Sequence, residues 1–264
     1  MQIATSTLHQ ATSSSLTATN GAGFLLALAV GSVLIGQSIH AEEARIVPVD
    51  VLEEPVSKKP VPAKLELSYG SPLRSHSFRL VGLGVRQVTF LNVSVYTIGF
   101  YLDADVMNRL RQSSDWKAGY KPEDMEKYVE KLVRGKGDIS VRVEPVRNTD
   151  GPHLRNGFMR ILTKQMGQEN LTEDEKTKVL AAMDEFRSAF PTGKVAKGEV
   201  FILTKTDDGV LRMEHEGVEK AYIKNRWIAE RLMEGYLREQ KSIAPKLRKS
   251  VGAGLEAVVR GFTA

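Results

Sequence analysis

The sequence predicts an α+β fold in which one antiparallel sheet is covered by a layer of helices. Three observations carry this prediction: alternating segments within residues 77–102 and 138–146, two helical patterns over 153–188, and a later hairpin followed by two more helices. Runs of strands that alternate with runs of helices are typical of helices packed on an antiparallel sheet. The 264 residues suit one domain of about 200 residues preceded by a leader.

The first strands are expected at residues 77–80, 85–90 and 92–102. β-branched and apolar residues dominate all three segments, and the last one carries apolar residues on both faces, as does a strand covered on both sides. A turn at Leu91-Asn92 would join 85–90 to the following strand as a hairpin.

A helical region is expected over residues 103–134, where Pro122 suits a first turn. Residues 138–146 then alternate, which predicts a strand with one face in water. The residues expected to point inward are Ile139, Val141 and Val143, and those expected to point outward are Ser140, Arg142 and Glu144.

The second half of the chain begins with a helix over residues 153–167. Thr172 and Glu175 have the spacing of a capping box, which starts the next helix. The remaining expected elements are strands 199–206 and 210–214 around the turn Asp207-Asp208-Gly209, followed by helices 220–239 and 245–259.

The first 63 residues are expected to lie outside the folded domain, which is assigned to residues 64–264. Residues 1–41 carry no Asp, Glu, Lys or Arg, and the apolar run inside this leader predicts a short membrane anchor at 21–37. A cleavable secretory signal and a buried helix are the alternatives. Residues 42–63 contain four prolines, which predicts an extended linker.

Composition excludes several classes of site. Lys and Arg total 37 against 32 Asp and Glu, and the net charge of +5 comes without a basic stripe, so nucleic acid is not an expected partner. The absence of cysteine excludes thiol catalysis and zinc–thiolate sites. The histidines do not have the spacing of zinc ligands, and no phosphate-binding loop is present.

One arginine has an unusual setting. Arg86 lies between Val85 and Val88 in a predicted strand, and Tyr96 follows on the next strand, ten residues later. The predicted hairpin would bring the two within reach of each other. A charged guanidinium beside a tyrosine hydroxyl makes a good clamp for a carboxylate or oxyanion. The alternative is an ordinary charge that faces solvent at the edge of a sheet.

These segments resemble the chalcone isomerase family and its fatty-acid-binding relatives. The resemblance is carried in order by Gly82-Leu83-Gly84-Val85-Arg86, the run Val93–Asp103, Phe190-Pro191-Thr192-Gly193, the segment beginning Ile223-Lys224-Asn225, and Pro245–Ser250. It implies the family fold, an open-faced β-sandwich with a helical layer. The leader and the run Arg147–Phe158 are most similar to the fungal mitochondrial members, the altered-inheritance-of-mitochondria proteins. That likeness implies a single-pass protein of the mitochondrial inner membrane. It does not indicate which side of the membrane the domain faces.

The resemblance also assigns roles to residues. In chalcone isomerases an arginine steers the substrate oxyanion, and Arg86 matches it. Tyr96 stands at the position of a family threonine, with Thr97 one step away, and Asn156 matches a family asparagine. Arg86, Tyr96, Thr97 and Asn156 are therefore the candidate catalytic set if the chain is an isomerase of the intramolecular-lyase type.

Other family contacts are missing, since Ala229 replaces a late serine or threonine and no tyrosine falls within 147–160. This favours a protein that is not an efficient enzyme. The fatty-acid-binding relatives hold a carboxylate with an arginine and a tyrosine, which Arg86 and Tyr96 match.

The expected ligand is therefore small, apolar and acidic: a fatty acid, haem or a chalcone-like molecule. No cofactor is assigned firmly. Haem is the one cofactor that the resemblance to fungal members allows, with His153 as a candidate iron ligand and a further ligand-binding residue, and His215 as a second candidate. The remaining interpretation is a membrane scaffold protein with a filled pocket.

Overall fold

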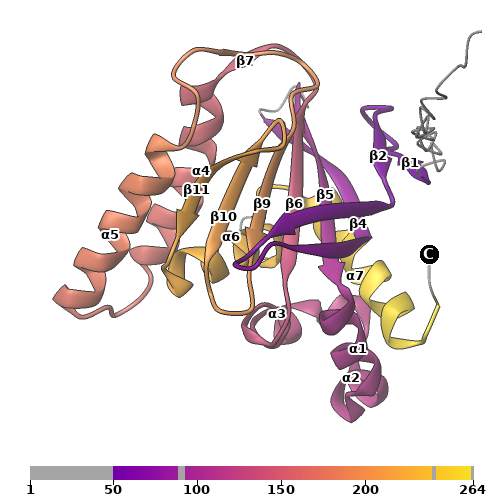
Figure 1. Ribbon diagram of the computed structural model, residues 1–264. Helices are drawn as coiled ribbons and strands as arrows, with labels where there is room; N and C mark the ends of the chain where they lie inside the picture. Colours follow the sequence, from indigo (N-terminus) through magenta and orange to yellow (C-terminus); the bar gives the residue numbers. More distant parts are fainter. Residues whose placement is uncertain (1–49, 89–92, 240–241, 263–264) are drawn as a thin grey trace, which may run out of the picture. The chain divides into compact units, whose positions relative to one another are not determined.

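The computed structural model describes residues 50–88, 93–239 and 242–262. A seven-stranded antiparallel sheet forms the centre of the described part, with strand order β11-β10-β9-β6-β5-β4-β3 (Figure 1). The strands are β3 Lys64–Tyr69, β4 Arg74–Val88, β5 Val93–Asp103, β6 Ile139–Pro145, β9 Phe201–Lys205, β10 Leu211–His215 and β11 Val218–Ile223.

The helices lie along one face and one end of this sheet (Figure 1). They are α1 Ala104–Gln112, α2 Ser114–Gly119, the 3-10 turn η1 Pro122–Asp124, α3 Met125–Arg134, α4 Gly151–Met166, α5 Glu173–Ser188, α6 Arg226–Leu237 and α7 Pro245–Val259. Helix α7 packs on β4 and β5, and α6 packs on β9 and β10. The main core fills the space between helices and strands, which confirms the predicted α+β class.

The capping box forms as predicted. Thr172 accepts a hydrogen bond from the backbone of Glu175, and the Glu175 carboxylate accepts one from the backbone of Thr172. Helix α7 spans the predicted 245–259, with Pro245 in its first turn, where a missing backbone N–H costs nothing.

A second core lies on the other face of the sheet, which corrects the expectation of a wet face on β6. The sheet curls, so that Leu65 and Leu67 of edge strand β3 share a buried cluster with Ile202 of β9. Ser140 and Glu144, both expected in water, are therefore buried. Ser140 remains satisfied by the Thr204 hydroxyl at 2.7 Å, because burial of a polar group requires such a partner.

The prediction for the linker is wrong over residues 51–62, where β1 Val51–Glu53 pairs with β2 Pro60–Pro62. Prolines are tolerated here because this ladder has two strands, and each strand needs donors on one side only. Val61 is completely buried in the second core. The Ser57 hydroxyl also bonds that of Thr97 at 3.0 Å, so the hairpin is packed on the sheet.

Strand β11 was also missed, because residues 220–239 were expected to form one helix. Residues 218–223 pair with β10 instead, and Ala221 and Ile223 of this strand are buried. Helix α6 begins after Asn225, whose side chain caps it by accepting a hydrogen bond from Ile228 N at 3.2 Å. Two further short strands, β7 Thr149–Asp150 and β8 Lys194–Val195, pair beside α4.

The glycines of the Gly-Leu-Gly segment let β4 and α7 approach closely. A Cβ on Gly84 would lie 2.5 Å from the backbone nitrogen of Leu247, and one on Gly82 would lie 2.5 Å from that of Val251. The Ser250 hydroxyl accepts a hydrogen bond from Leu83 N at 3.1 Å. This segment and the last helix therefore form one packing unit.

Within residues 50–88, 93–239 and 242–262, no helix has the length and apolar character needed to cross a membrane. The predicted anchor at 21–37, the rest of the leader and the turn at Leu91-Asn92 lie outside the described residues.

Candidate anion-binding site

Arg86 and Tyr96 lie directly opposite each other on β4 and β5. The Nη1 atom of Arg86 donates a hydrogen bond to the Tyr96 hydroxyl at 2.9 Å. The guanidinium carbon also lies 5.5 Å from the centre of the tyrosine ring. The cross-strand neighbourhood expected from the sequence is therefore present, and Tyr96 holds the arginine in one orientation.

Tyr236 of α6 is a third polar group at this point, and sequence reasoning missed it. Its side chain is completely buried. Burial raises the pKa of Tyr236, the nearby Tyr96 hydroxyl raises it further, and Arg86 opposes the shift. The two hydroxyls are thus close neighbours, but their geometry falls short of a hydrogen bond, and the Tyr236 hydroxyl has no partner among the described atoms.

The charge on Arg86 has no acidic partner in the described part of the chain. Burial alone would lower the pKa of Arg86, but Tyr96 and Tyr236 more than offset this effect, so its pKa is raised. The guanidinium stays charged at every physiological pH. A half-buried cation that is held by the Tyr96 hydroxyl and has no carboxylate partner among the described residues is well suited to an external anion.

Helix α4 passes directly beside this guanidinium. A Cβ on Gly157 would lie 2.9 Å from Nη1 of Arg86, so the absence of a side chain makes room for the arginine. Phe158, the next residue, lies parallel to the Tyr96 ring with centres 6.3 Å apart. The helix is anchored by Asp150, which caps its first turn through His153 N at 2.7 Å.

A cavity of about 570 Å³ opens from Arg86 between α3, α4 and α6. Helix α4 lines the cavity with one of its faces. Apart from the glycines, Ile161 and Ile243 are the two apolar residues in the lining. The residues from α4 and the segment after it are Gly157, Arg160, Ile161, Lys164, Gln165, Gln168 and Glu169.

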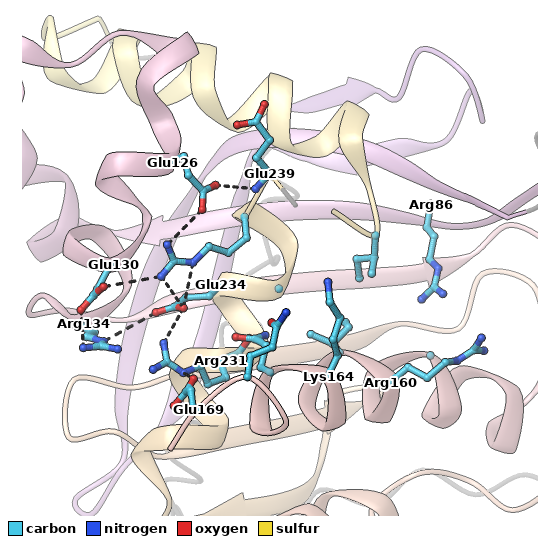
Figure 2. A pocket seen from close by; sticks show the side chains of 17 residues that line it. Arg86, Glu126, Glu130, Arg134, Arg160, Lys164, Glu169, Arg231, Glu234 and Glu239 are labelled. Carbon is cyan, nitrogen blue, oxygen red and sulfur yellow. Dashed lines mark hydrogen bonds and ion pairs between the residues drawn. The ribbon is translucent and has the colours of Figure 1, made fainter. Parts of the chain in front are cut away.

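The far end of the cavity is a network of ion pairs centred on Glu234 (Figure 2). Its carboxylate is 1% exposed and accepts hydrogen bonds from Arg231 at 2.8 Å and from Arg238 at 3.1 Å. Burial would lower the pKa of both arginines, but Glu234, together with Glu169 for Arg231 and Glu126 for Arg238, raises it above the ordinary value. The arginines at this end are therefore neutralised, in contrast to Arg86.

The other residues singled out in the sequence lie elsewhere. Thr97 points to the opposite face of the sheet, where it meets Ser57. Asn156 and His153 are exposed on α4 and do not line the cavity. Tyr96 lies behind Arg86 rather than in the cavity wall, so the arginine is the member of the pair that the cavity exposes.

The remaining histidine candidate, His215, is held by structural contacts. It stacks on Phe201 with ring centres 4.2 Å apart, and its Nε2 lies 2.7 Å from the Glu199 carboxylate. Ala229, at the family's serine or threonine position, is fully buried in the core. Over the described residues, no group of three His, Asp or Glu side chains has the arrangement of a metal site.

Sequence reasoning missed Gly157, Arg160 and Tyr236. The helical spacing of Gly157, Arg160, Ile161 and Lys164 is visible in the sequence and places them on one face. Nothing in the sequence indicates that this face lines a cavity, because the helix also carries buried residues such as Leu154 and Phe158 on another side.

Comparison with known proteins agrees with this structure. The family model described as "Chalcone isomerase like" matches residues 76–252. A curated relative from Debaryomyces hansenii, "Altered inheritance of mitochondria protein 18, mitochondrial", is 31% identical over 200 residues, which cover 67% of this chain and 66% of that protein. An uncharacterized protein of Schizosaccharomyces pombe is 28% identical over 193 residues, covering 69% of this chain and 72% of its own length.

Among solved structures, a fatty-acid binding protein of Arabidopsis thaliana (AtFAP1) superposes with a TM-score of 0.62 at 19% identity, covering 80% of this chain and all of that one. At this identity the likeness concerns the fold. A curled antiparallel sheet covered by helices is the class of fold that the two structures share. The chain belongs to the chalcone isomerase-like family.

Proposed function

We propose that this protein binds a small amphipathic acid, and that Arg86 holds the acidic group. The observation that carries the proposal is a charged, half-buried guanidinium at the end of a cavity, held by Tyr96 at 2.9 Å and without a carboxylate partner among the described residues. A carboxylate here would receive charge-assisted hydrogen bonds from a donor that is already oriented.

The same geometry argues for binding without efficient turnover. Ring closure of a chalcone needs several donors around the ketone, and each positioned donor is worth about 3–4 kcal/mol of barrier. Thr97 faces the other side of the sheet and Asn156 lies outside the cavity. Of the candidate catalytic set, Arg86 alone lines the cavity, while Tyr96 positions it. An intramolecular lyase is therefore the second candidate, favoured by Arg86 alone, and a scaffold with a filled pocket is the third.

The fatty-acid form of the proposal is supported by the superposition on AtFAP1, whose name states that ligand class. The haem form is less well supported. Arg86 would suit a propionate, but the cavity lining contains no histidine, and His153 is exposed outside it. His153 therefore does not fit as an iron ligand in this cavity.

We further propose that the protein is mitochondrial, as the names of the Debaryomyces and Eremothecium gossypii relatives state for those proteins. In this proposal, residues 21–37 anchor it in the inner membrane with a single span. The apolar, uncharged composition of this segment supports the anchor.

The test is a calorimetric titration of the full chain with dodecanoate, together with native mass spectrometry of the purified protein. Arg86→Gln should lose affinity by about tenfold or more, because a hydrogen-bonded charge pair is worth about 1.5–3 kcal/mol. Arg187→Gln is the matched control, since Arg187 is exposed on α5 and pairs with Asp184 at 2.5 Å. Equal dodecanoate affinity in the wild type and Arg86→Gln would contradict the proposed role of Arg86.

A further inference from the structure

The cavity contains a second arginine without an acidic partner. Arg160 of α4 lines the same cavity as Arg86 of β4, and no described carboxylate lies within ion-pair distance of it. Among the described residues, its one hydrogen bond runs from Nε to the backbone oxygen of Asn156 at 3.2 Å, and its terminal guanidinium nitrogens make none there. Figure 2 shows Arg86, Arg160 and Lys164 on one side, away from the glutamates.

The helix geometry brings these cations together. Arg86 lies against Gly157, and Arg160 follows one helical turn later on the same face of α4. Lys164 lines the cavity a further turn along. The ion-paired arginines at the far end have their charges balanced by Glu126, Glu130, Glu169 and Glu234, so the cationic end is a distinct region of the cavity.

We infer that the ligand's head group carries two negative charges, as a phosphate monoester does, rather than one. This inference rests on the proposed role of Arg86 as the anion contact. A monocarboxylate would occupy Arg86 and leave Arg160 uncompensated. A phosphate monoester offers three acceptor oxygens and about two charges at neutral pH, which matches the two guanidinium groups. The polar wall also suits a strongly hydrated head better than the end of an alkyl chain.

The experiment compares three probes on the full chain by calorimetry at pH 8: dodecyl phosphate, dodecanoate and inorganic phosphate, each below micelle formation. The wild type should bind dodecyl phosphate about tenfold more tightly than dodecanoate. Tighter binding of dodecyl phosphate than of inorganic phosphate identifies an amphiphile, and equal binding identifies a free phosphate as the ligand. Dodecyl phosphate affinity should also rise as the pH increases through the second ionisation of the phosphate, near pH 6.

The variants separate this inference from the proposed function. Arg160→Gln should weaken dodecyl phosphate about tenfold and change dodecanoate by less than threefold. Arg86→Gln should weaken both probes, and the exposed control Arg187→Gln neither. Arg160→Gln could leave the affinity for dodecyl phosphate unchanged while Arg86→Gln still weakens the binding of both probes. That result would contradict a doubly charged head group and would leave the Arg86 site in place. If neither substitution matters, both proposals fall.

Discussion

The guanidinium of Arg86 occupies the space where a side chain at Gly157 would begin, since a Cβ there would lie 2.9 Å from Nη1. A cation on β4 and a helix backbone 71 residues later in the chain are therefore fitted to each other. The end of an arginine side chain moves more easily than a helix backbone. An added methyl would consequently shift the guanidinium and leave the fold in place.

Gly157→Ala should thus weaken anion binding without destabilising the protein. Alanine favours a helix interior over glycine by about 1 kcal/mol, so the free energy of unfolding should stay unchanged or rise. Dodecanoate affinity should fall about tenfold, because the displaced arginine loses part of a hydrogen-bonded charge pair worth about 1.5–3 kcal/mol. Calorimetry and urea unfolding measure the two quantities.

Gly252→Ala is the matched control for that change. Gly252 lies inside helix α7, and a Cβ there would make ordinary contacts at 3.5 Å with Met125 and Pro122. Its stability should also stay unchanged or rise, and its dodecanoate affinity should equal that of the wild type. If the Gly157 variant binds as tightly as the Gly252 variant, the fit between α4 and Arg86 has no role in binding.

The two tyrosines beside Arg86 should respond in opposite ways to loss of their hydroxyls. Tyr96→Phe removes the acceptor of the 2.9 Å bond from Arg86 and should lower stability by about 1 kcal/mol, a reduced value because Arg86 is only half-buried. Tyr236→Phe removes a buried hydroxyl that has no hydrogen-bond partner among the described residues, so stability should stay equal or rise. Denaturant unfolding of both variants decides this, and equal losses in the two would contradict the unpaired state of Tyr236.

Local patterns predicted the elements whose signals lie within a few residues. The capping box at Thr172, Pro245 at the start of α7 and the Arg86–Tyr96 neighbourhood all depend on short spacings, and the structure contains each of them. The expected family is likewise the one that the comparisons show.

The features that were missed depend on how distant segments meet. Ser140 and Glu144 are buried because the sheet curls and because residues 51–62 cover it, and neither cause is encoded within β6 itself. Tyr236 belongs to the candidate site only because the fold brings its hydroxyl close to Tyr96 and Arg86. The charged residues of 218–223 would also suit a helix, but this segment forms β11 because it pairs with β10.

Gly84→Ala should be severely destabilising, in contrast to the two helix glycines above. The new methyl would lie 2.5 Å from the Leu247 nitrogen and 2.7 Å from its Cα, and backbone atoms of α7 cannot move aside without separating the helix from β4. Overpacking of this kind costs about 1–3 kcal/mol and sometimes more. Gly193→Ala, where no atom lies within 4 Å of the added methyl, is the control for thermal unfolding. A normal melting temperature for Gly84→Ala would show that α7 does not hold this strand.

Stability should fall steeply as the pH rises above about 10, the range in which tyrosines ionise in the unfolded chain. Burial raises the pKa of Tyr69, Tyr101, Tyr120 and Tyr236 above that value in the folded state. An acid with a raised folded pKa contributes stability that is complete below its unfolded pKa and is lost as the pH rises toward the folded one. Lys205 acts in the opposite direction, since burial lowers its pKa. The slope of the free energy of unfolding against pH therefore contains contributions from several groups.

A difference between two proteins isolates one of these groups. The Tyr120 hydroxyl donates to the Gly252 carbonyl at 3.1 Å, and Tyr120→Phe removes one titrating group while retaining the ring against Trp116 and Tyr128. The free energy of unfolding of the wild type should therefore fall more steeply than that of the variant by about 1.4 kcal/mol per pH unit above pH 10. Urea unfolding at pH 9, 10 and 11 measures both slopes. Parallel slopes would mean that Tyr120 ionises as readily in the folded protein as in the unfolded chain, which its enclosed position between α2, α3 and α7 argues against.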